Sequence, residues 1–167
     1  MQLQEERQAL PPQPLEGALE ALAAGTVVNG FRLVRRVGKG GYGEAWLAVS
    51  VHRPGRYCVL KFALASPEED ATADARAVRE VQMLLQAAHP HVLRVLGYGR
   101  WPDLDTGIHY TVLEWVEGGT LLEWARTANP SLRQVVRLAQ KLVRALQAAH
   151  ERGVVHRDIK PDNRAGE

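Results

Sequence analysis

Alternating apolar and polar positions in the first half of the chain predict a set of short β-strands. Phe31, Leu33 and Val37 are separated by basic residues, and apolar side chains recur at every second position from 45 to 51. A third apolar run covers 57–62. Turns that contain Gly or Pro separate the three runs, so the sequence predicts three consecutive antiparallel strands.

A helix and two further strands are expected next. The helix should run from Ser66 to about Ala88, because Ser, Pro and Glu occupy its N-cap, first and third positions as in a capping box. Two more apolar runs, 92–97 and 109–114, follow and are joined by a segment rich in Pro, Asp and Gly. Together these patterns predict five antiparallel strands with one helix.

The last third of the chain changes to a helical period. A short helix is expected from 120 to 128, and Ser131 with Gln134 forms a second capping box. Apolar residues then recur at helical spacing up to Ala149, and Gly153 marks the end of this helix. Strands followed by helices predict an α+β architecture.

The first 30 residues carry a different pattern. Polar residues are followed by Pro11, Pro12 and Pro14, and the stretch 15–22 has the spacing of a short amphipathic helix. We expect residues 1–30 to form a flexible leader. Neither a signal segment nor a run of about 18 apolar residues occurs, so the sequence predicts no membrane segment and a cytoplasmic location.

The composition says more about possible binding partners than about the fold. The 167 residues are 46% hydrophobic, enough for one core, and the 21 basic and 19 acidic residues are spread along the chain. Because there is no basic tract, the sequence predicts no nucleic-acid binding. The single cysteine, Cys58, cannot form an internal disulfide, and we expect it to be a buried strand residue in a reducing compartment.

The glycines of the first turn fit the pattern G-x-G-x-x-G, with Gly38, Gly40 and Gly43 at the three fixed positions. A dinucleotide-binding turn would be followed by a helix, whereas a strand pattern follows here. A Walker A loop would end in Gly-Lys-Ser/Thr, whereas Glu44 and Ala45 follow the last glycine. A plain hairpin turn stays open as an alternative. The context of strand, turn and strand favours a loop whose backbone amides approach a nucleotide.

A second motif lies near the end of the chain. Residues 156–163 read His-Arg-Asp-Ile-Lys-Pro-Asp-Asn, which places a base, a cation and a metal-ligating amide at fixed offsets. Phosphoryl transfer is catalysed by groups of this kind. The stretch therefore predicts a catalytic loop.

From about residue 31 to 163 the chain resembles a eukaryotic-like serine/threonine protein kinase of bacterial type. The resemblance rests on an ordered set of features: the glycine-rich turn, Lys61, Glu80, His89-Pro90, Glu114 with Gly118-Gly119, and the catalytic loop. Any one motif could arise by chance, but the ordered set is specific. The resemblance implies ATP and Mg²⁺ as cofactors and a protein as substrate.

The resemblance assigns the chemistry to the catalytic loop. Asp158 would accept the proton of the substrate hydroxyl, and Asn163 would hold a magnesium ion. Lys160 would offset charge on the transferred phosphoryl group, in the arrangement of serine/threonine rather than tyrosine kinases. These three residues are the predicted catalytic residues, and Asn163 is the predicted metal ligand.

The resemblance also pairs Lys61 with Glu80. A lysine at a strand end is usually a solvated charge, but a kinase lysine at this place contacts the α- and β-phosphates and is held by a glutamate of the following helix. Glu80 is flanked by Val78 and Val81, which would pack it inward. The acidic residues of the first helical turns are better explained as N-terminal helix charges.

The family places the adenine of ATP between apolar side chains and the hinge backbone. The implied residues are Val37, Ala45 and Val59 as the roof, Leu113 as the gatekeeper, and the backbone of Glu114 and Val116 as hydrogen-bond partners. At position 45, where the family usually has Val, this chain has Ala45, and at position 59, where the family usually has Ala, it has Val59. Because the total volume is kept, this exchange suggests a packed adenine slot.

The resemblance divides the chain into the leader and an incomplete kinase domain at 31–167. This domain comprises the N-lobe at 31–114, the hinge at 115–119, the start of the C-lobe at 120–163 and an atypical polar tail at 164–167. Asp-Phe-Gly and the later C-lobe elements do not occur in the 167 residues, so we expect a truncated, inactive chain.

The alternative function is a non-catalytic nucleotide-binding or interaction remnant. The helix at 131–152 carries a long apolar stripe. If no further helices cover that stripe, it would be exposed to a partner or to aggregation.

Overall fold

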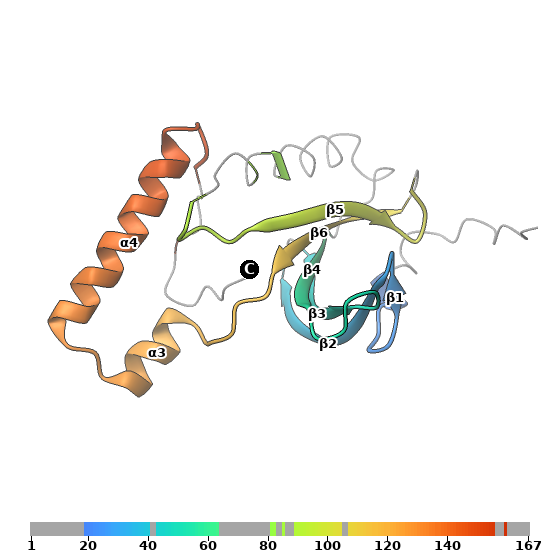
Figure 1. Ribbon diagram of the computed structural model, residues 1–167, viewed down its shortest axis with the longest axis horizontal. Helices are drawn as coiled ribbons and strands as arrows, with labels where there is room; N and C mark the ends of the chain where they lie inside the picture. The colour runs from blue at the N-terminus through green and yellow to red at the C-terminus, as the bar shows by residue number, and fades with distance from the viewer. Residues whose placement is uncertain are drawn as a thin grey trace, which may run out of the picture.

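The computed structural model describes residues 19–40, 43–63, 81, 82, 85, 89–104, 107–155 and 159. Within these residues it contains six strands and two longer helices (Figure 1). They are β1 (Val27–Val28), β2 (Phe31–Gly40), β3 (Gly43–Ser50), β4 (Tyr57–Ala63), β5 (Val95–Trp101), β6 (Ile108–Glu114), α3 (Leu121–Ala128) and α4 (Leu132–His150).

The six strands form one antiparallel sheet in the order β1-β2-β3-β4-β6-β5. The α+β prediction is confirmed, and the sheet has one strand more than the predicted five. The extra strand, β1, pairs with β2 through a two-residue turn at Asn29 and Gly30. Both residues have positive φ angles, 44° and 87°, as a type I′ hairpin turn requires.

The N-terminal strand corrects the expected boundary of the leader. Residues 1–18 lie outside the described part of the chain, but Leu22 and Val28 are buried in the main core of the sheet. Leu19 packs against the same core. Residues 19–30 are therefore part of the folded domain, because their apolar side chains close one face of the sheet.

This closed face holds most of the buried apolar side chains. Its core cluster contains Leu22, Val28, Leu33, Trp46, Ala48, Cys58, Leu60, Phe62, Ile108, Tyr110 and Val112. The Asn29 side chain links its N-terminal edge to the far strands, because Nδ2 donates to the Arg100 carbonyl at 3.0 Å and to the Tyr110 hydroxyl at 2.8 Å. The sheet thus curls around this core (Figure 1).

The later strands differ slightly from the prediction. The first of them was expected at 92–97, whereas β5 begins at Val95 and ends at Trp101. Its register against β6 shifts between Val95 and Gly97, which is a bulge. An extra residue in one strand changes its alternation, so a simple period-two pattern misplaces it.

Both C-terminal helices begin within a residue of the predicted positions, and both are capped. The Thr120 hydroxyl accepts from the Glu123 amide at 3.0 Å, and the Glu123 carboxylate accepts from the Thr120 amide at 2.8 Å. Ser131 and Gln134 form the same capping box at α4. Beyond α4 the chain turns at Gly153, whose φ is 75°. The helix expected from Ser66 lies mostly outside the described residues, which show helix at 81, 82 and 85.

The two helices stand to one side of the sheet and follow β6 through an extended connection (Figure 1). Ala145 is the buried residue of α4. The apolar stripe of this helix is exposed, with Leu132 at 79% and Val143 at 60% relative exposure. In the described part of the chain no helix is long and apolar enough to cross a membrane.

Candidate functional site

A second, smaller apolar cluster lies on the sheet face opposite the main core. Its buried members are Ala45, Val59 and Leu113, and its partly buried members are Val37, Leu93, Val95 and Trp115. The strand register brings these residues together, because Val59 lies directly opposite both Leu47 and Leu113. All four residues that the sequence assigned to the roof and the gatekeeper position belong to this cluster.

Val37 reaches this cluster through an irregularity in β2. The register between β2 and β3 shifts between Arg36 and Gly38, which makes Val37 the extra residue of a bulge. A bulge redirects a side chain that regular alternation would place differently. The partly buried apolar surface is therefore continued from β3 and β4 onto the strand that leads into the glycine loop.

Lys61 extends from the same face of the sheet. Side chains two residues apart in a strand share a face, so Lys61 shares the face of Val59. Across the sheet it is paired with Ala45 on β3 and Thr111 on β6. Its side chain therefore begins next to the apolar cluster and is half-buried.

The glycine-rich turn joins β2 to β3 as a tight hairpin in which Gly40 pairs with Gly43. Gly43 has a φ of 150°, and a Cβ built there would overlap the carbonyl oxygen of Phe62. A Cβ built at Gly40 would meet nothing within 4 Å. The sheet itself therefore requires glycine at 43, whereas no protein atom requires it at 40.

Glu44 is a site residue that the sequence reasoning missed. It is 4% exposed although it carries a charge. Its carboxylate accepts from Lys39 Nζ at 2.8 Å, from Trp46 Nε1 at 3.2 Å and from Arg36 Nη1 at 3.4 Å. Burial alone would raise the pKa of Glu44, but these hydrogen bonds and the two positive charges hold its pKa below the ordinary value.

The hinge begins at the end of β6, where Glu114 is tied to the segment before β5. The Glu114 amide donates to the Arg94 carbonyl at 3.0 Å, and the Arg94 amide donates to the Glu114 carboxylate at 2.8 Å. The next residue, Trp115, has the Arg35 guanidinium 5.9 Å from its ring centroid. Val116 is exposed. The hinge is thus held on both sides by neighbouring segments.

Four predicted site residues lie outside the described part of the chain. They are Glu80, Asp158, Lys160 and Asn163. The Lys61–Glu80 pair, the base and the magnesium ligand therefore stay predictions. Of the catalytic loop only Ile159 is described, and it is exposed.

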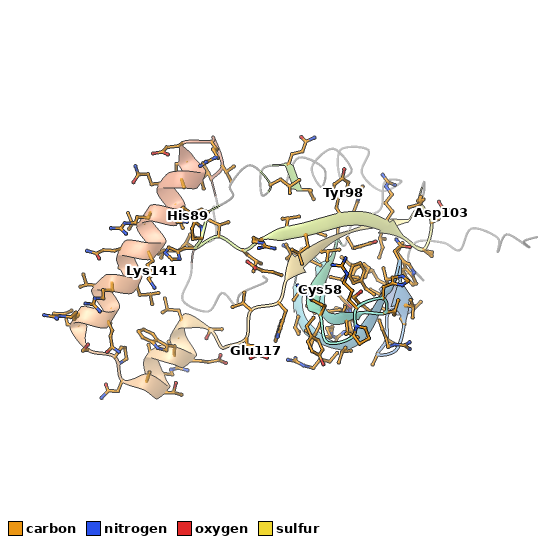
Figure 2. All side chains as sticks on the ribbon, viewed as in Figure 1. Cys58, His89, Tyr98, Asp103, Glu117 and Lys141 are labelled. Carbon is orange, nitrogen blue, oxygen red and sulfur yellow. The ribbon has the colours of Figure 1, made fainter. Side chains whose placement is uncertain are left out.

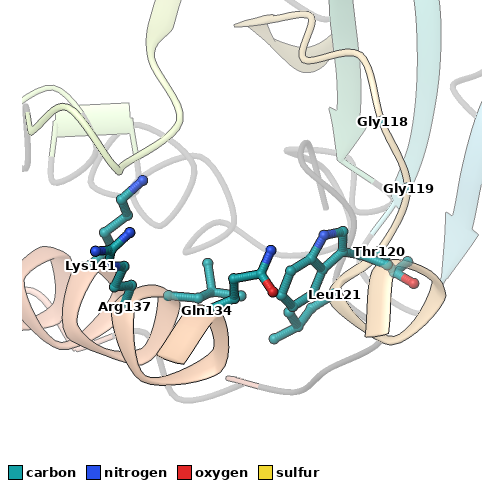
Figure 3. A pocket seen from close by; sticks show the side chains of 9 residues that line it. Gly118, Gly119, Thr120, Leu121, Gln134, Arg137 and Lys141 are labelled. Atoms are coloured by element: carbon teal, nitrogen blue, oxygen red, sulfur yellow. The ribbon is translucent and has the colours of Figure 1, made fainter. Parts of the chain in front are cut away.

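A cavity of about 570 Å³ has walls that share no residue with the apolar cluster (Figure 3). Its walls come from the end of the hinge and from α3 and α4, and they comprise Gly118, Gly119, Thr120, Leu121, Trp124, Gln134, Arg137, Leu138 and Lys141. A Cβ at Gly119 would overlap the Glu123 carboxylate that caps α3. At Gly118 a Cβ would meet nothing within 4 Å, but the φ of 141° is one that favours glycine.

Cys58 lies among the strands, as the sequence predicted (Figure 2). Burial raises the pKa of its thiol to about 11. The thiol is therefore protonated at neutral pH and unsuited to nucleophilic chemistry.

Comparison with known proteins agrees with this arrangement. The family model of the protein kinase domain matches residues 31–164. The chain is 34% identical over 142 residues to serine/threonine-protein kinase PknJ of Mycobacterium tuberculosis, a match that covers 85% of this chain and 23% of that protein. It is 35% identical over 143 residues to serine/threonine-protein kinase C of Synechocystis, with 81% and 26% covered.

A solved structure shows the same fold. The kinase domain of Mycobacterium tuberculosis PknI superposes with a TM-score of 0.65 at 29% identity, and the match covers 86% of this chain and 57% of that domain. The chain thus spans about a quarter of the length of the curated relatives and somewhat more than half of the solved domain.

Proposed function

Because the chain belongs to the protein kinase family, we propose that it carries the ATP-binding half of a serine/threonine protein kinase domain. The complete domain would transfer the γ-phosphoryl group of ATP to serine or threonine hydroxyls of a protein. One observation carries the proposal: Val37, Ala45, Val59 and Leu113 form one apolar cluster on the face from which Lys61 extends. A nucleotide needs this combination of an apolar surface for its base and a cation for its phosphates.

The adenine ring of ATP would lie on the cluster and face the hinge. Ala45 and Val59 are already buried, while Val37 and Trp115 are partly exposed and would be covered by the ring. The Glu114 amide already donates to Arg94, so its contribution to the adenine edge would come from its carbonyl oxygen. Val116, two residues further along the hinge, would contribute a second backbone hydrogen bond.

The phosphates of ATP would lie between the glycine loop and Lys61. Open space at Gly40 fits a backbone that a phosphate approaches closely. Lys61 starts beside Ala45, so its ammonium would neutralise phosphate charge next to the adenine slot. Glu80 would hold Lys61 in place.

The chemical step would belong to the catalytic loop. A bound Mg²⁺ would supply neutralisation of the charge on the phosphates. Asn163 would be one of its ligands. Asp158 would take the proton of the substrate hydroxyl, and Lys160 would stabilise the transferred phosphoryl group. The match of residues 31–164 to the kinase domain supports these assignments.

We further propose that the 167-residue polypeptide alone does not catalyse phosphoryl transfer. Asp-Phe-Gly, whose aspartate holds the principal magnesium ion in kinases, does not occur in the 167 residues. The alternative, a nucleotide-binding or interaction remnant, is favoured by the exposed apolar stripe of α4. That stripe would bind a partner or cause aggregation. We also propose a cytoplasmic location, which the single cysteine, free of any disulfide, supports.

Calorimetric titration with ATP tests the nucleotide site. The chain, purified as a fusion to a carrier protein, should bind ATP weakly and with little dependence on magnesium. Lys61→Met should weaken binding about tenfold, because one charge-assisted contact to phosphate is lost. Lys141→Met, a matched change on α4 (Figure 2), should leave binding unchanged. Equal effects of the two changes would contradict the assigned site.

A phosphorylation assay separates the two functions. In a chain extended with a kinase C-lobe, phosphotransfer to a generic serine/threonine substrate should appear and should be abolished by Asp158→Asn or Lys61→Met. The 167-residue chain should show none. Robust phosphotransfer by the 167-residue chain that Asp158→Asn removes would overturn its proposed inactivity.

A further inference from the structure

The carboxylate of Glu44 lies at the base of the glycine loop, on the opposite face from Ala45. Glu44 is the direct cross-strand partner of Lys39, one pair away from the Gly40 and Gly43 pair that closes the hairpin. Its side chain shares the inner face with Trp46, a member of the main core. A buried charge therefore sits directly behind the loop proposed to cover the phosphates.

The contacts of Glu44 cross between the two arms of this hairpin. Lys39 and Arg36 belong to β2, at 2.8 Å and 3.4 Å, and Trp46 belongs to β3, at 3.2 Å. The Lys39 and Arg36 side chains are 61% and 50% exposed, whereas that of Glu44 is 5% exposed. An ion pair between two exposed side chains contributes little to stability. A buried carboxylate that accepts several hydrogen bonds fixes the position of its donors more strongly.

The loop offers few side chains that could fix its position. Four of the six residues from 38 to 43 are glycine, and Lys39 stands between the first two glycines. The N-terminal segment comes close on the same face, because Leu19, Glu20 and Leu22 line a cavity of about 190 Å³ together with Arg36, Lys39 and Glu44. The buried carboxylate is thus the point where both arms and the N-terminal segment meet.

We propose that Glu44 is a positioning residue that holds the glycine loop over the phosphates of the nucleotide, and that it acts through Lys39 and Arg36. This inference rests on the proposed nucleotide function. Glu44 faces away from the nucleotide side, so it does not touch the nucleotide. Losing it should loosen the loop and weaken contacts to phosphate, while the adenine slot on the other face stays intact.

Hydrogen exchange tests the loop directly and does not depend on ATP binding. Glu44→Gln keeps the shape of the side chain and removes its charge, and Glu151→Gln at the exposed end of α4 is the matched control. In Glu44→Gln the amides of residues 36–46 should speed up about tenfold more than those of β4 and β6, whose exchange should change only as the overall stability does. Unchanged protection of residues 36–46 would overturn the proposal.

Affinities for ATP and adenosine separate positioning from general destabilisation. Glu44→Gln should weaken ATP binding about tenfold and adenosine binding less than about twofold. Lys39→Met should have a similar effect, and the double variant should be no worse than either single one, because both changes break the same contact. Equal losses for ATP and adenosine would reveal a merely structural role and overturn the proposal.

Two further results are informative. In one of them, Glu44→Gln binds ATP more tightly and the gain disappears when Lys39→Met is added. This result would show that Glu44 holds Lys39 away from the phosphates, and it would also overturn the proposal. If the unaltered chain binds neither ATP nor adenosine, the proposed nucleotide function fails for this polypeptide, and the role of Glu44 for ATP fails with it. Faster exchange in residues 36–46 would then show only that the carboxylate fixes the loop.

Discussion

The two faces of the sheet are built from the same strands but are used differently. One face, with Phe62, Leu60 and Tyr110 at its centre, is closed by the chain's own N-terminal residues. The other carries a smaller cluster, in which the buried residues Ala45, Val59 and Leu113 pack against side chains that are only partly buried. Adjacent residues of one strand therefore serve folding on one side and leave room for a ligand on the other.

The strongest test of this contrast compares neighbouring residues of β4. Phe62→Ala should lower the free energy of unfolding by about 4 kcal/mol, because it empties the centre of the closed face, where its ring lies 5.6 Å from that of Tyr110. Val59→Ala on the open face should cost about 2 kcal/mol, since it removes two methyl groups. Urea unfolding followed by circular dichroism measures both. Equal costs would mean that both faces are packed alike.

The glycines of the loop sharpen the comparison. Gly43→Ala should destabilise the sheet by about 2 kcal/mol, because the new Cβ would collide with the Phe62 carbonyl. Gly40→Ala should change stability by less than about 0.5 kcal/mol but weaken ATP binding, because its methyl group would occupy open space near the phosphates. Thermal unfolding and ATP titration of the two variants give the answer. A stability loss at Gly40 with unchanged binding would reverse the two roles.

The dependence of stability on pH tests the contribution of the buried Glu44 carboxylate behind the glycine loop. Since the pKa of Glu44 is lowered from its ordinary value of 4.5, its contribution to stability is present above that value and is lost as pH falls through the lower folded-state pKa. Glu44→Gln should therefore be less stable than the unaltered chain by about 1–2 kcal/mol at pH 7. This difference in the free energy of unfolding should shrink below about pH 4.5. A gap that stays constant down to pH 3 would show that the charge of Glu44 does not contribute.

The smallest expected effect concerns the exchanged roof residues. Ala45→Val alone should overfill the adenine slot and weaken ATP binding, and adding Val59→Ala should restore it. The non-additivity should be about 1 kcal/mol, within the range for residues that share a pocket. Calorimetric ATP titration of the two single variants and the double variant measures it. Strictly additive effects would place Ala45 and Val59 in separate environments.

Much of the ligand-facing side could be predicted from the sequence, because its residues follow regular strand alternation. Ala45, Val59, Lys61 and Leu113 lie at alternate positions of three neighbouring strands, so one register brings them to one face. The cap residue Ser131 also predicted the start of α4, since capping is a local property.

The features that the sequence did not predict depend on contacts between distant segments. Glu44 has the pattern of an ordinary exposed charge, and its burial arises from Lys39, Arg36 and Trp46 around it. The pairing of Gly40 with Gly43 places Lys39 opposite Glu44. Asn29-Gly30 is a strong hairpin signal, although the proline-rich segment before it favours flexibility.

The hydrogen bonds of the Asn29 side-chain amide bear on the order in which the chain folds during its synthesis. It bonds to partners 71 and 81 residues later in the sequence. Residues near the N-terminus leave the ribosome first, and at about 5–20 residues per second their partners follow on the order of ten seconds later. During that interval Leu22 and Val28 have no completed core to enter. A segment that is synthesised before its partners therefore completes its contacts with the sheet only after they have followed.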